Sequence, residues 1–249
     1  MEDLTRKGTG KIALVTGASR GVGAAVSQLL AQGGTSVVLN YRSKGARAEE
    51  VAERIGQTGA TAMLAQADMT SETDVRSMLI QVKERFQTLD VLVLNASGGL
   101  EKGKPLDYAM NLNLTAQTRL ADLAQPLMGP GSCIVFVTSH LAHFYGQKPV
   151  GDYYEPVAAS KKAGEDALRS RIPQWAAAGI RLVVVSGDLI EGTITPKLME
   201  RANPGFIEER REQAGTLPTI ESFAQAIVAA ALDETLESGT TIFVGSTEW

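Results

Sequence analysis

The sequence predicts an α/β fold, a doubly wound domain with a seven-stranded parallel sheet, and three observations support this. Short apolar runs rich in β-branched residues alternate with segments of helical spacing along most of the chain. These runs are apolar throughout, which is typical of parallel strands buried on both faces. The 249 residues contain no linker, repeat or low-complexity segment. We therefore expect residues 1–249 to form a single domain.

The strands are expected at residues 12–15, 36–41, 62–67, 90–94, 133–138, 182–185 and 241–244. Helical spacing follows the first strand and covers residues 46–55, 106–128, 157–175 and 220–232. A further helix ends near Phe86, with Thr70 or Ser71 as its N-cap. We expect a loop to run from the fifth strand to about Pro156.

Composition excludes several function classes. The net charge is −4 and no basic run of five occurs, which argues against a nucleic-acid partner. Cys133 is the single cysteine, and the two histidines are too few for a convincing metal site. The apolar runs are too short to span a bilayer, and the first residues lack the apolar core of a signal peptide. A cytoplasmic protein without a membrane partner is the expectation.

The stretch KIALVTGASRGVG, residues 11–23, passes from strand to glycine-rich turn to helix. Free N–H groups at a helix N-terminus form an anion site, and glycines let a phosphate approach the backbone. The spacing is GxxxGxG, which differs from the usual dinucleotide fingerprint GxGxxG. A tight turn without a ligand is the alternative interpretation of this stretch alone.

Polar residues follow several other strands, and the carboxyl ends of parallel strands share one edge, where ligands of doubly wound sheets bind. Asp68 follows the third strand, Asn95-Ala-Ser-Gly the fourth, and Ser139 the fifth. Together with TGASRGVG, these motifs resemble the short-chain dehydrogenase/reductase family, from about Lys11 to the C-terminus. The resemblance implies a Rossmann-type fold and a nicotinamide dinucleotide cofactor. The implied contacts are Gly17, Ser19, Arg20, Gly21, Val22 and Gly23 for the pyrophosphate and ribose, Asp68 and Met69 for adenine, and Asn95, Ala96 and Ser97 near the middle. Lys161 would bind the nicotinamide ribose, Thr193 would contact the carboxamide or the phosphates, and Gly187 is a further cofactor residue.

The end of the second strand predicts which cofactor is preferred. An NAD site usually places a carboxylate there, to accept from the ribose 2′-hydroxyl. Here the residues are Asn40, Tyr41, Arg42 and Ser43, and Arg20 projects from the glycine turn. Guanidinium groups match a 2′-phosphate, so we predict NADP(H).

The catalytic pattern departs from the family. Its usual YxxxK has Lys161 in place, but Val157 stands where the tyrosine is expected and cannot donate a proton. Tyr154 and Lys161 form Y-x6-K, the spacing of enoyl-acyl carrier protein reductases in the same superfamily. Tyr153 and the histidines His140 and His143 are alternative proton donors. Ser139 matches the family's serine, and Asn113 matches the asparagine of its proton relay.

We therefore expect an NADPH-dependent reductase of a ketone or of a double bond conjugated to a carbonyl, including carrier- or CoA-bound thioesters. Tyr154, Ser139, Asn113 and Lys161 would supply the acid, oxygen binding and relay. A non-catalytic NADP(H)-binding protein is the alternative. A serine-histidine hydrolase fits poorly, because Ser139 lacks the GxSxG turn. Residues 195–215 resemble the family's substrate lid, and a homodimer or homotetramer is implied.

Overall fold

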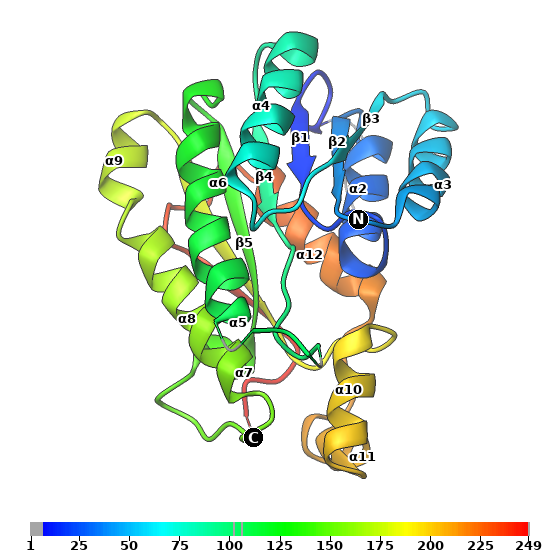
Figure 1. The fold of residues 1–249 in the computed structure, drawn as a ribbon, viewed down its shortest axis with the longest axis vertical. Helices are drawn as coiled ribbons and strands as arrows, with labels where there is room; N and C mark the ends of the chain where they lie inside the picture. Colours follow the sequence, from blue (N-terminus) through cyan, green and yellow to red (C-terminus); the bar gives the residue numbers. More distant parts are fainter. Residues whose placement is uncertain (1–6, 102, 106, 249) are drawn as a thin grey trace.

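One seven-stranded parallel sheet forms the centre of the molecule (Figure 1). The computed structural model describes residues 7–101, 103–105 and 107–248. The strand order is β3-β2-β1-β4-β5-β6-β7, which confirms the predicted sheet. The bounds are β1 (Ile12–Val15), β2 (Ser36–Tyr41), β3 (Ala62–Gln66), β4 (Val91–Leu94), β5 (Cys133–Ser139), β6 (Arg181–Gly187) and β7 (Thr241–Val244). The strand order reverses between β1 and β4, where such sheets bind ligands.

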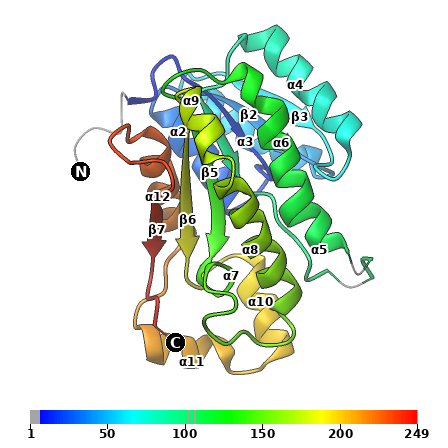
Figure 2. The ribbon, with the colours of Figure 1, turned by 90° about the vertical axis from the view of Figure 1, so that its left-hand side faces the viewer.

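Helices cover both faces of the sheet (Figures 1 and 2). One face packs against α2 (Gly21–Gln32), α3 (Gly45–Gly56) and α12 (Ile220–Leu232). The other packs against α4 (Glu72–Phe86), α6 (Ala116–Ala124), α8 (Glu155–Arg169) and α9 (Ile172–Ala177). The shorter elements are α5 (Tyr108–Met110), the π-helical turn η1 (Asn111–Thr115), η2 (Gln125–Leu127), α7 (His140–His143), α10 (Ile194–Ala202) and α11 (Phe206–Ala214).

Alternate residues of each central strand enter opposite cores. Leu14 and Leu92 pack under α4 and α6, whereas Val15 and Val93 pack under α2 and α12. All four side chains are fully or almost fully buried. This two-sided burial explains why the strands are continuous apolar runs.

The helix predicted over residues 106–128 is divided in the structure. Leu106 lies outside the described residues, and the remainder forms α5, η1, α6 and η2 in succession. The π-helical turn η1 contains Asn113, whose side chain bonds outside the helix. π-helical turns are often found at functional sites.

Prolines account for a second difference from the sequence prediction. The helix predicted over residues 157–175 is observed as α8 and α9. Pro156 and Pro173 lie in the first turns of these helices, where no intrahelical N–H bond is needed. Each proline therefore begins a helix. The loop predicted before Pro156 also contains a short helix, α7, capped by the Ser139 hydroxyl.

Two helices lie beyond the carboxyl ends of the strands. Figure 1 shows α10 and α11 at this edge, next to the loops that follow β5 and β6. They occupy the segment expected to form the lid. Among the described residues, no helix is long and apolar enough to cross a membrane.

Candidate active site

The glycine turn between β1 and α2 depends on three glycines for different reasons. Gly17 and Gly21 have φ angles of 66° and 56°, in the left-handed region that disfavours a side chain. A Cβ on Gly23 would lie 2.5 Å from the Gly17 carbonyl oxygen. A Cβ on Gly21 would meet no protein atom within 4 Å, so there is open space at the start of α2. These features fit a phosphate held by backbone N–H groups.

Side chains from neighbouring strand ends fix this turn. The Asn95 amide donates to the Thr16 carbonyl at 2.8 Å, and the Thr16 hydroxyl accepts from the N–H groups of Asn95 and Ala96 at 2.9 Å. The Gln117 amide of α6 donates to the Ala96 carbonyl. Thr16 and Gln117 are supporting residues that sequence reasoning missed. Their supporting role follows only from their hydrogen bonds to Asn95 and Ala96 in the folded structure.

The prediction for Asn40 requires correction. Its side chain is only 1% exposed, its carbonyl oxygen accepts from Gly17 N–H at 3.3 Å, and its amide donates to the carbonyls of Ala65 and Ala67. A side chain so engaged supports the turn and does not face a ribose. Although Asn40 stands at the end of β2, its side chain is already bonded to three backbone groups and is therefore not free to bind a ligand.

The residues after Asn40 are accessible. Arg42 is exposed, donates to the Tyr108 hydroxyl at 2.9 Å and lies 4.0 Å from the Asp68 carboxylate. Arg20 is also exposed, at the start of α2. Tyr41 is half-buried and Ser43 exposed, while Met69 is buried. Both arginines are therefore accessible to a ligand at this edge of the sheet.

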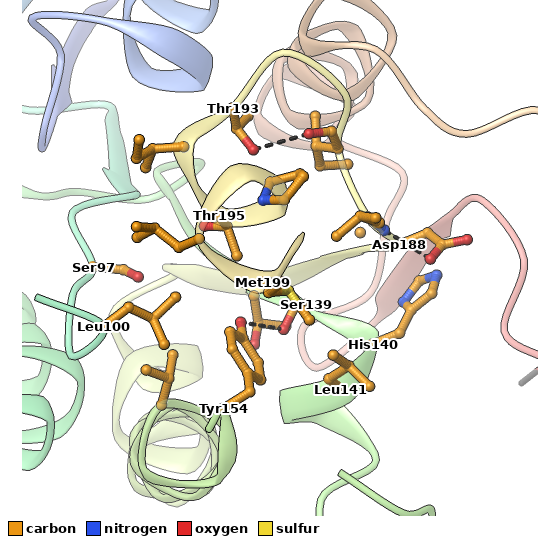
Figure 3. A pocket seen from close by; sticks show the side chains of 18 of the residues that line it. Ser97, Leu100, Ser139, His140, Leu141, Tyr154, Asp188, Thr193, Thr195 and Met199 are labelled. Carbon is orange, nitrogen blue, oxygen red and sulfur yellow. Dashed lines mark hydrogen bonds between the residues drawn. The ribbon is translucent and has the colours of Figure 1, made fainter. Parts of the chain in front are cut away.

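A cavity of about 450 Å³ opens beside the glycine turn (Figure 3). Its polar lining combines residues from the turn and from four strand ends, and several were predicted as site residues: Arg20, Val22, Asn95, Ser97, Ser139, Tyr154, Lys161, Gly187 and Thr193. The remaining predicted cofactor residues lie at or near the same edge of the sheet, outside this lining. Apolar walls come from Leu100, Leu141, Val157, Met199 and Phe206.

Ser139 and Tyr154 meet in this cavity. Their hydroxyl oxygens are 3.1 Å apart and hydrogen-bonded, as Figure 3 shows. Ser139 ends β5, and Tyr154 is the N-cap residue of α8, 4% exposed. Burial raises the pKa of the Tyr154 phenol, although its bond with Ser139 opposes this. The phenol is therefore protonated near neutral pH and available as an acid.

Lys161 lies two helical turns beyond Tyr154 on α8 and also lines the cavity. Its side chain is almost fully buried, and burial lowers the pKa of its ammonium to about 8. Val157 lies between them in the usual tyrosine position and contributes an apolar wall. Tyr154, the N-cap residue of α8, therefore reaches the cavity from the beginning of the helix.

Asn113 occupies the π-helical turn and is 2% exposed. Its amide donates to the Gly98 carbonyl at 2.8 Å and to the Ser160 hydroxyl at 3.0 Å. A Cβ on Gly164 would lie 2.2 Å from the Asn113 carbonyl oxygen, so α8 approaches this turn closely. Asn113 therefore fixes the loop after β4 against the helix that carries Lys161.

The two histidines face different partners. His140 Nδ1 lies 2.8 Å from the Ser186 hydroxyl, and burial lowers the pKa of His140 to about 4. His143 Nδ1 lies 2.9 Å from the Glu165 carboxylate. His140 lines the cavity, whereas Tyr154 is the candidate donor bonded to Ser139. No group of three potential metal ligands occurs in the described part of the chain.

An ion pair fixes α11 to the strand ends. Arg210 of α11 donates twice to the Asp188 carboxylate, both times at 2.8 Å, and both side chains are 6% exposed. The same guanidinium donates to the carbonyls of Ser246 and Glu248. Arg210 lies 22 residues after Asp188 in the sequence, so no local pattern indicates that the two side chains pair.

Thr193 and Gly187 border the cavity below the lid. The Thr193 hydroxyl donates to the Ile190 carbonyl at 2.9 Å. A Cβ on Gly187 would lie 2.7 Å from the Phe223 ring and 2.9 Å from Ile190. Close packing therefore requires glycine at position 187.

Comparison with known proteins gives consistent relatives. Hydroxynaphthalene reductase arp2 of Aspergillus fumigatus is 37% identical over 139 residues, 53% of this chain and 50% of the relative. A short chain dehydrogenase from Burkholderia cenocepacia J2315, solved in complex with NADP, is 27% identical with a TM-score of 0.84, covering 96% of this chain and 98% of that one. Angucycline C-6 ketoreductase LanV, solved with bound NADP, is 26% identical with a TM-score of 0.81, covering 97% of both chains.

The matches with curated hydroxynaphthalene reductases span between 50% and 64% of those relatives' length. The family model for short chain dehydrogenases matches residues 11–203, more than half of the chain. The fold, the glycine turn and the strand-end residues agree with that match. The chain therefore belongs to the short chain dehydrogenase family.

Proposed function

We propose that this protein is an NADPH-dependent reductase that converts a ketone to an alcohol. The main support is the hydrogen-bonded pair of the Ser139 and Tyr154 hydroxyls. This pair lies in a cavity that Lys161 and residues of the glycine turn also line. Relatives named as hydroxynaphthalene reductase and C-6 ketoreductase support the reaction class. Structures solved with NADP support the cofactor.

The residues present fit a dinucleotide phosphate. The glycine turn would hold the pyrophosphate, and Arg20 and Arg42 would bind a 2′-phosphate. Asp68 and Met69 would lie by the adenine, and Ser97, Lys161, Gly187 and Thr193 by the nicotinamide end. When bound, NADPH supplies the hydride.

The protein's own residues would supply the proton that the substrate oxygen needs. The Tyr154 hydroxyl would donate its proton to the substrate oxygen as negative charge develops there. Ser139 would hold the same oxygen by a hydrogen bond. Loss of the proton leaves a phenolate in a cavity that contains the Lys161 ammonium, and the opposite charge favours that state. A proton from solvent would restore the phenol after the alcohol leaves.

The apolar walls favour a fused-ring aromatic ketone as substrate. Leu100, Leu141, Val157 and Met199 offer flat apolar surface, and a few polar groups at one end fix the carbonyl. The names of the relatives indicate aromatic substrates of this kind. The spacing between Tyr154 and Lys161 also keeps enoyl thioesters among the substrates to be tested.

We further propose a cytoplasmic homodimer or homotetramer. Met110 on α5 and Phe243 on β7 are exposed apolar side chains, 41% and 42% accessible. An interface through α5, α8 and β7 would cover them. Sedimentation of the purified protein tests the assembly.

The function is tested by turnover of NADPH with aromatic ketones, quinones and enoyl thioesters. We expect Tyr154→Phe to reduce kcat by about 10²- to 10⁴-fold while NADPH still binds, because the acid is lost and the turn is intact. Tyr153→Phe is the matched control and should alter mainly KM, since Tyr153 lines the cavity without bonding Ser139.

Two outcomes would contradict this assignment. Full activity in Tyr154→Phe, with loss in Tyr153→Phe, would transfer the acid role to Tyr153. Tight NADPH binding with no turnover of any compound would favour the non-catalytic alternative.

A further inference from the structure

A buried carboxylate lies behind the active site. Glu165 of α8 is 0% exposed. One carboxylate oxygen lies 2.9 Å from Nδ1 of His143, and the other accepts from Nε of Arg169 at 2.8 Å. The proposed mechanism uses none of these three residues.

Glu165 is held in its ionised form. Burial alone would raise the pKa of its carboxyl group, but hydrogen bonds from His143 and Arg169 and their positive charge outweigh this and bring the pKa below its ordinary value. Arg169 is itself fixed, because its guanidinium donates to the Gly239 carbonyl and to the Thr241 hydroxyl at 2.6 Å. The negative charge therefore stays at one place inside the protein.

Lys161 is one helical turn from this charge. Residues four apart in a helix share a face, so Glu165 and Lys161 lie on the same side of α8. Within the described residues, Lys161 forms no hydrogen bond or ion pair. Glu165 is the charged group that raises the pKa of the Lys161 ammonium against the larger, lowering effect of burial.

Other titratable groups near α8 have different partners. His143 is the one from α7 that faces Glu165, and η1 contributes no ionisable side chain. The remaining groups on neighbouring elements are bonded elsewhere: His140 with Ser186, Arg119 with the Met69 carbonyl, Asp122 with Arg171, Tyr108 with Arg42, Arg181 with the Asp233 carbonyl, and Cys133 at the far end of β5.

The same carboxylate also joins the two elements that carry the hydroxyl pair. His143 belongs to α7, which begins directly after Ser139 and is capped by the Ser139 hydroxyl. Glu165 belongs to α8, which begins directly after Tyr154. The Glu165–His143 contact therefore ties α7 to α8, the two helices that begin directly after Ser139 and Tyr154.

We propose that Glu165 is a positioning residue whose fixed negative charge keeps the Lys161 ammonium protonated in the active-site cavity, with His143 and Arg169 holding that charge in place. The role within a catalytic cycle rests on the proposed function, but the electrostatic claim does not. The claim concerns two residues of this chain and is measurable without substrate.

The test is a pH titration of the Lys161 side chain by NMR, in protein carrying isotope-labelled lysine. The Lys161 signal is assigned by its loss in Lys161→Met. We expect Glu165→Gln to lower the Lys161 pKa by about one unit, because an opposite charge is removed from its vicinity. Asp166→Asn is the matched control, since it removes a carboxylate from the next position of α8, where Asp166 is exposed and pairs with Lys162. That control should leave the titration unchanged.

An unchanged Lys161 titration in Glu165→Gln, or an equal shift in Asp166→Asn, overturns the proposal. If Glu165→Gln does not fold, Glu165→Asp carries the test. The shorter side chain draws the carboxylate away from Lys161, so Lys161 should titrate at lower pH than in the wild type. An unchanged or higher value contradicts the proposal.

Turnover gives the second readout. In Glu165→Gln, the alkaline limb of the kcat profile should move to lower pH together with the NMR titration. If the protein reduces no substrate, the NMR shift still tests the electrostatic claim, so failure of the proposed function remains distinguishable. A moved NMR titration with an unmoved alkaline limb would show that Lys161 protonation does not limit turnover, and it would overturn the catalytic part.

Discussion

Lys161 shows at the scale of a residue how an active site opposes stability. Its ammonium is almost fully buried, and burial lowers its pKa from 10.5 to about 8. The same ammonium in an unfolded chain is hydrated and keeps its proton to higher pH. Folding at neutral pH therefore places the ammonium where it is less well solvated, which lowers the free energy of unfolding. The same burial puts a cation in the cavity.

We predict that Lys161→Met raises the free energy of unfolding at pH 7 by about 1 to 3 kcal/mol and abolishes turnover, because an unfavourably buried charge is replaced by an apolar chain. Denaturant titration measures the stability. In the wild type, stability should rise as pH increases from about 8 toward 10.5, because the unfolded chain keeps a proton that the native lysine has released. Lys161→Met should lack this rise, and an identical pH dependence in both proteins would contradict the prediction.

Sequence reasoning placed the candidate site residues at the carboxyl edge of the sheet, but it did not determine what each side chain touches. Asn40 stands at the expected strand end, yet its amide is used by the backbone of the turn and of β3. The choice among Tyr153, Tyr154 and the histidines was likewise open. In the structure Tyr154, directly before α8, is the one whose side chain bonds the Ser139 hydroxyl. Such contacts depend on the exact direction of the backbone, and the spacing of residues in the sequence does not determine that direction.

At the scale of elements, helix α11 is held to the sheet by one buried side chain, that of Arg210. Arg210 joins α11 to Asp188 after β6 and to the carbonyls of the final residues. One residue further along, Arg211 makes a comparable pair with Glu191, but these side chains are 48% and 39% exposed. Ion pairs of the exposed kind contribute little, whereas removing one partner of a buried pair leaves an uncompensated charge.

We predict that Arg210→Gln lowers the free energy of unfolding by about 3 to 5 kcal/mol, with faster amide hydrogen exchange in α11. Arg211→Gln is the matched control and should cost much less, because its ion pair is exposed to solvent. Thermal or denaturant unfolding of both variants, with hydrogen exchange, measures the difference. Equal losses in the two variants would show that the buried pair has no special role.

Element boundaries were most predictable where local signals and packing agree. Helix α12 and strand β7 were predicted with the observed bounds, because the Thr219 capping box starts α12 and β7 is a short apolar run after turn residues. The helix expected over residues 157–175 was wrong at both ends, since Pro156 and Pro173 each begin a helix. Proline indicates a boundary without saying on which side the helix lies.

At the scale of the whole molecule, cofactor binding should couple to global stability. The proposed cofactor site joins the glycine turn to the ends of β2, β4 and β6, which come from both halves of the sheet. A ligand that binds only the folded protein at about 100 times its Kd adds about 2.7 kcal/mol to the free energy of unfolding.

We predict that NADPH raises the melting temperature more than NADH at equal concentration, because Arg20 and Arg42 are proposed to bind the 2′-phosphate. Arg42→Ala should reduce this difference. Arg54→Ala removes an exposed arginine from the last turn of α3 and should preserve it. Thermal scans with each nucleotide provide the measurement. Equal stabilisation of the wild type by NADPH and NADH would contradict the cofactor assignment.

The order of strands in the sheet also determines when each supporting contact can form during synthesis on the ribosome. From β4 onward, each new strand adds beside the previous one, and β7 is added last. The segment just before β7 and its first residue supply the Gly239 carbonyl and the Thr241 hydroxyl that hold Arg169. A nascent chain therefore contains every proposed catalytic residue long before the support behind Lys161 is finished.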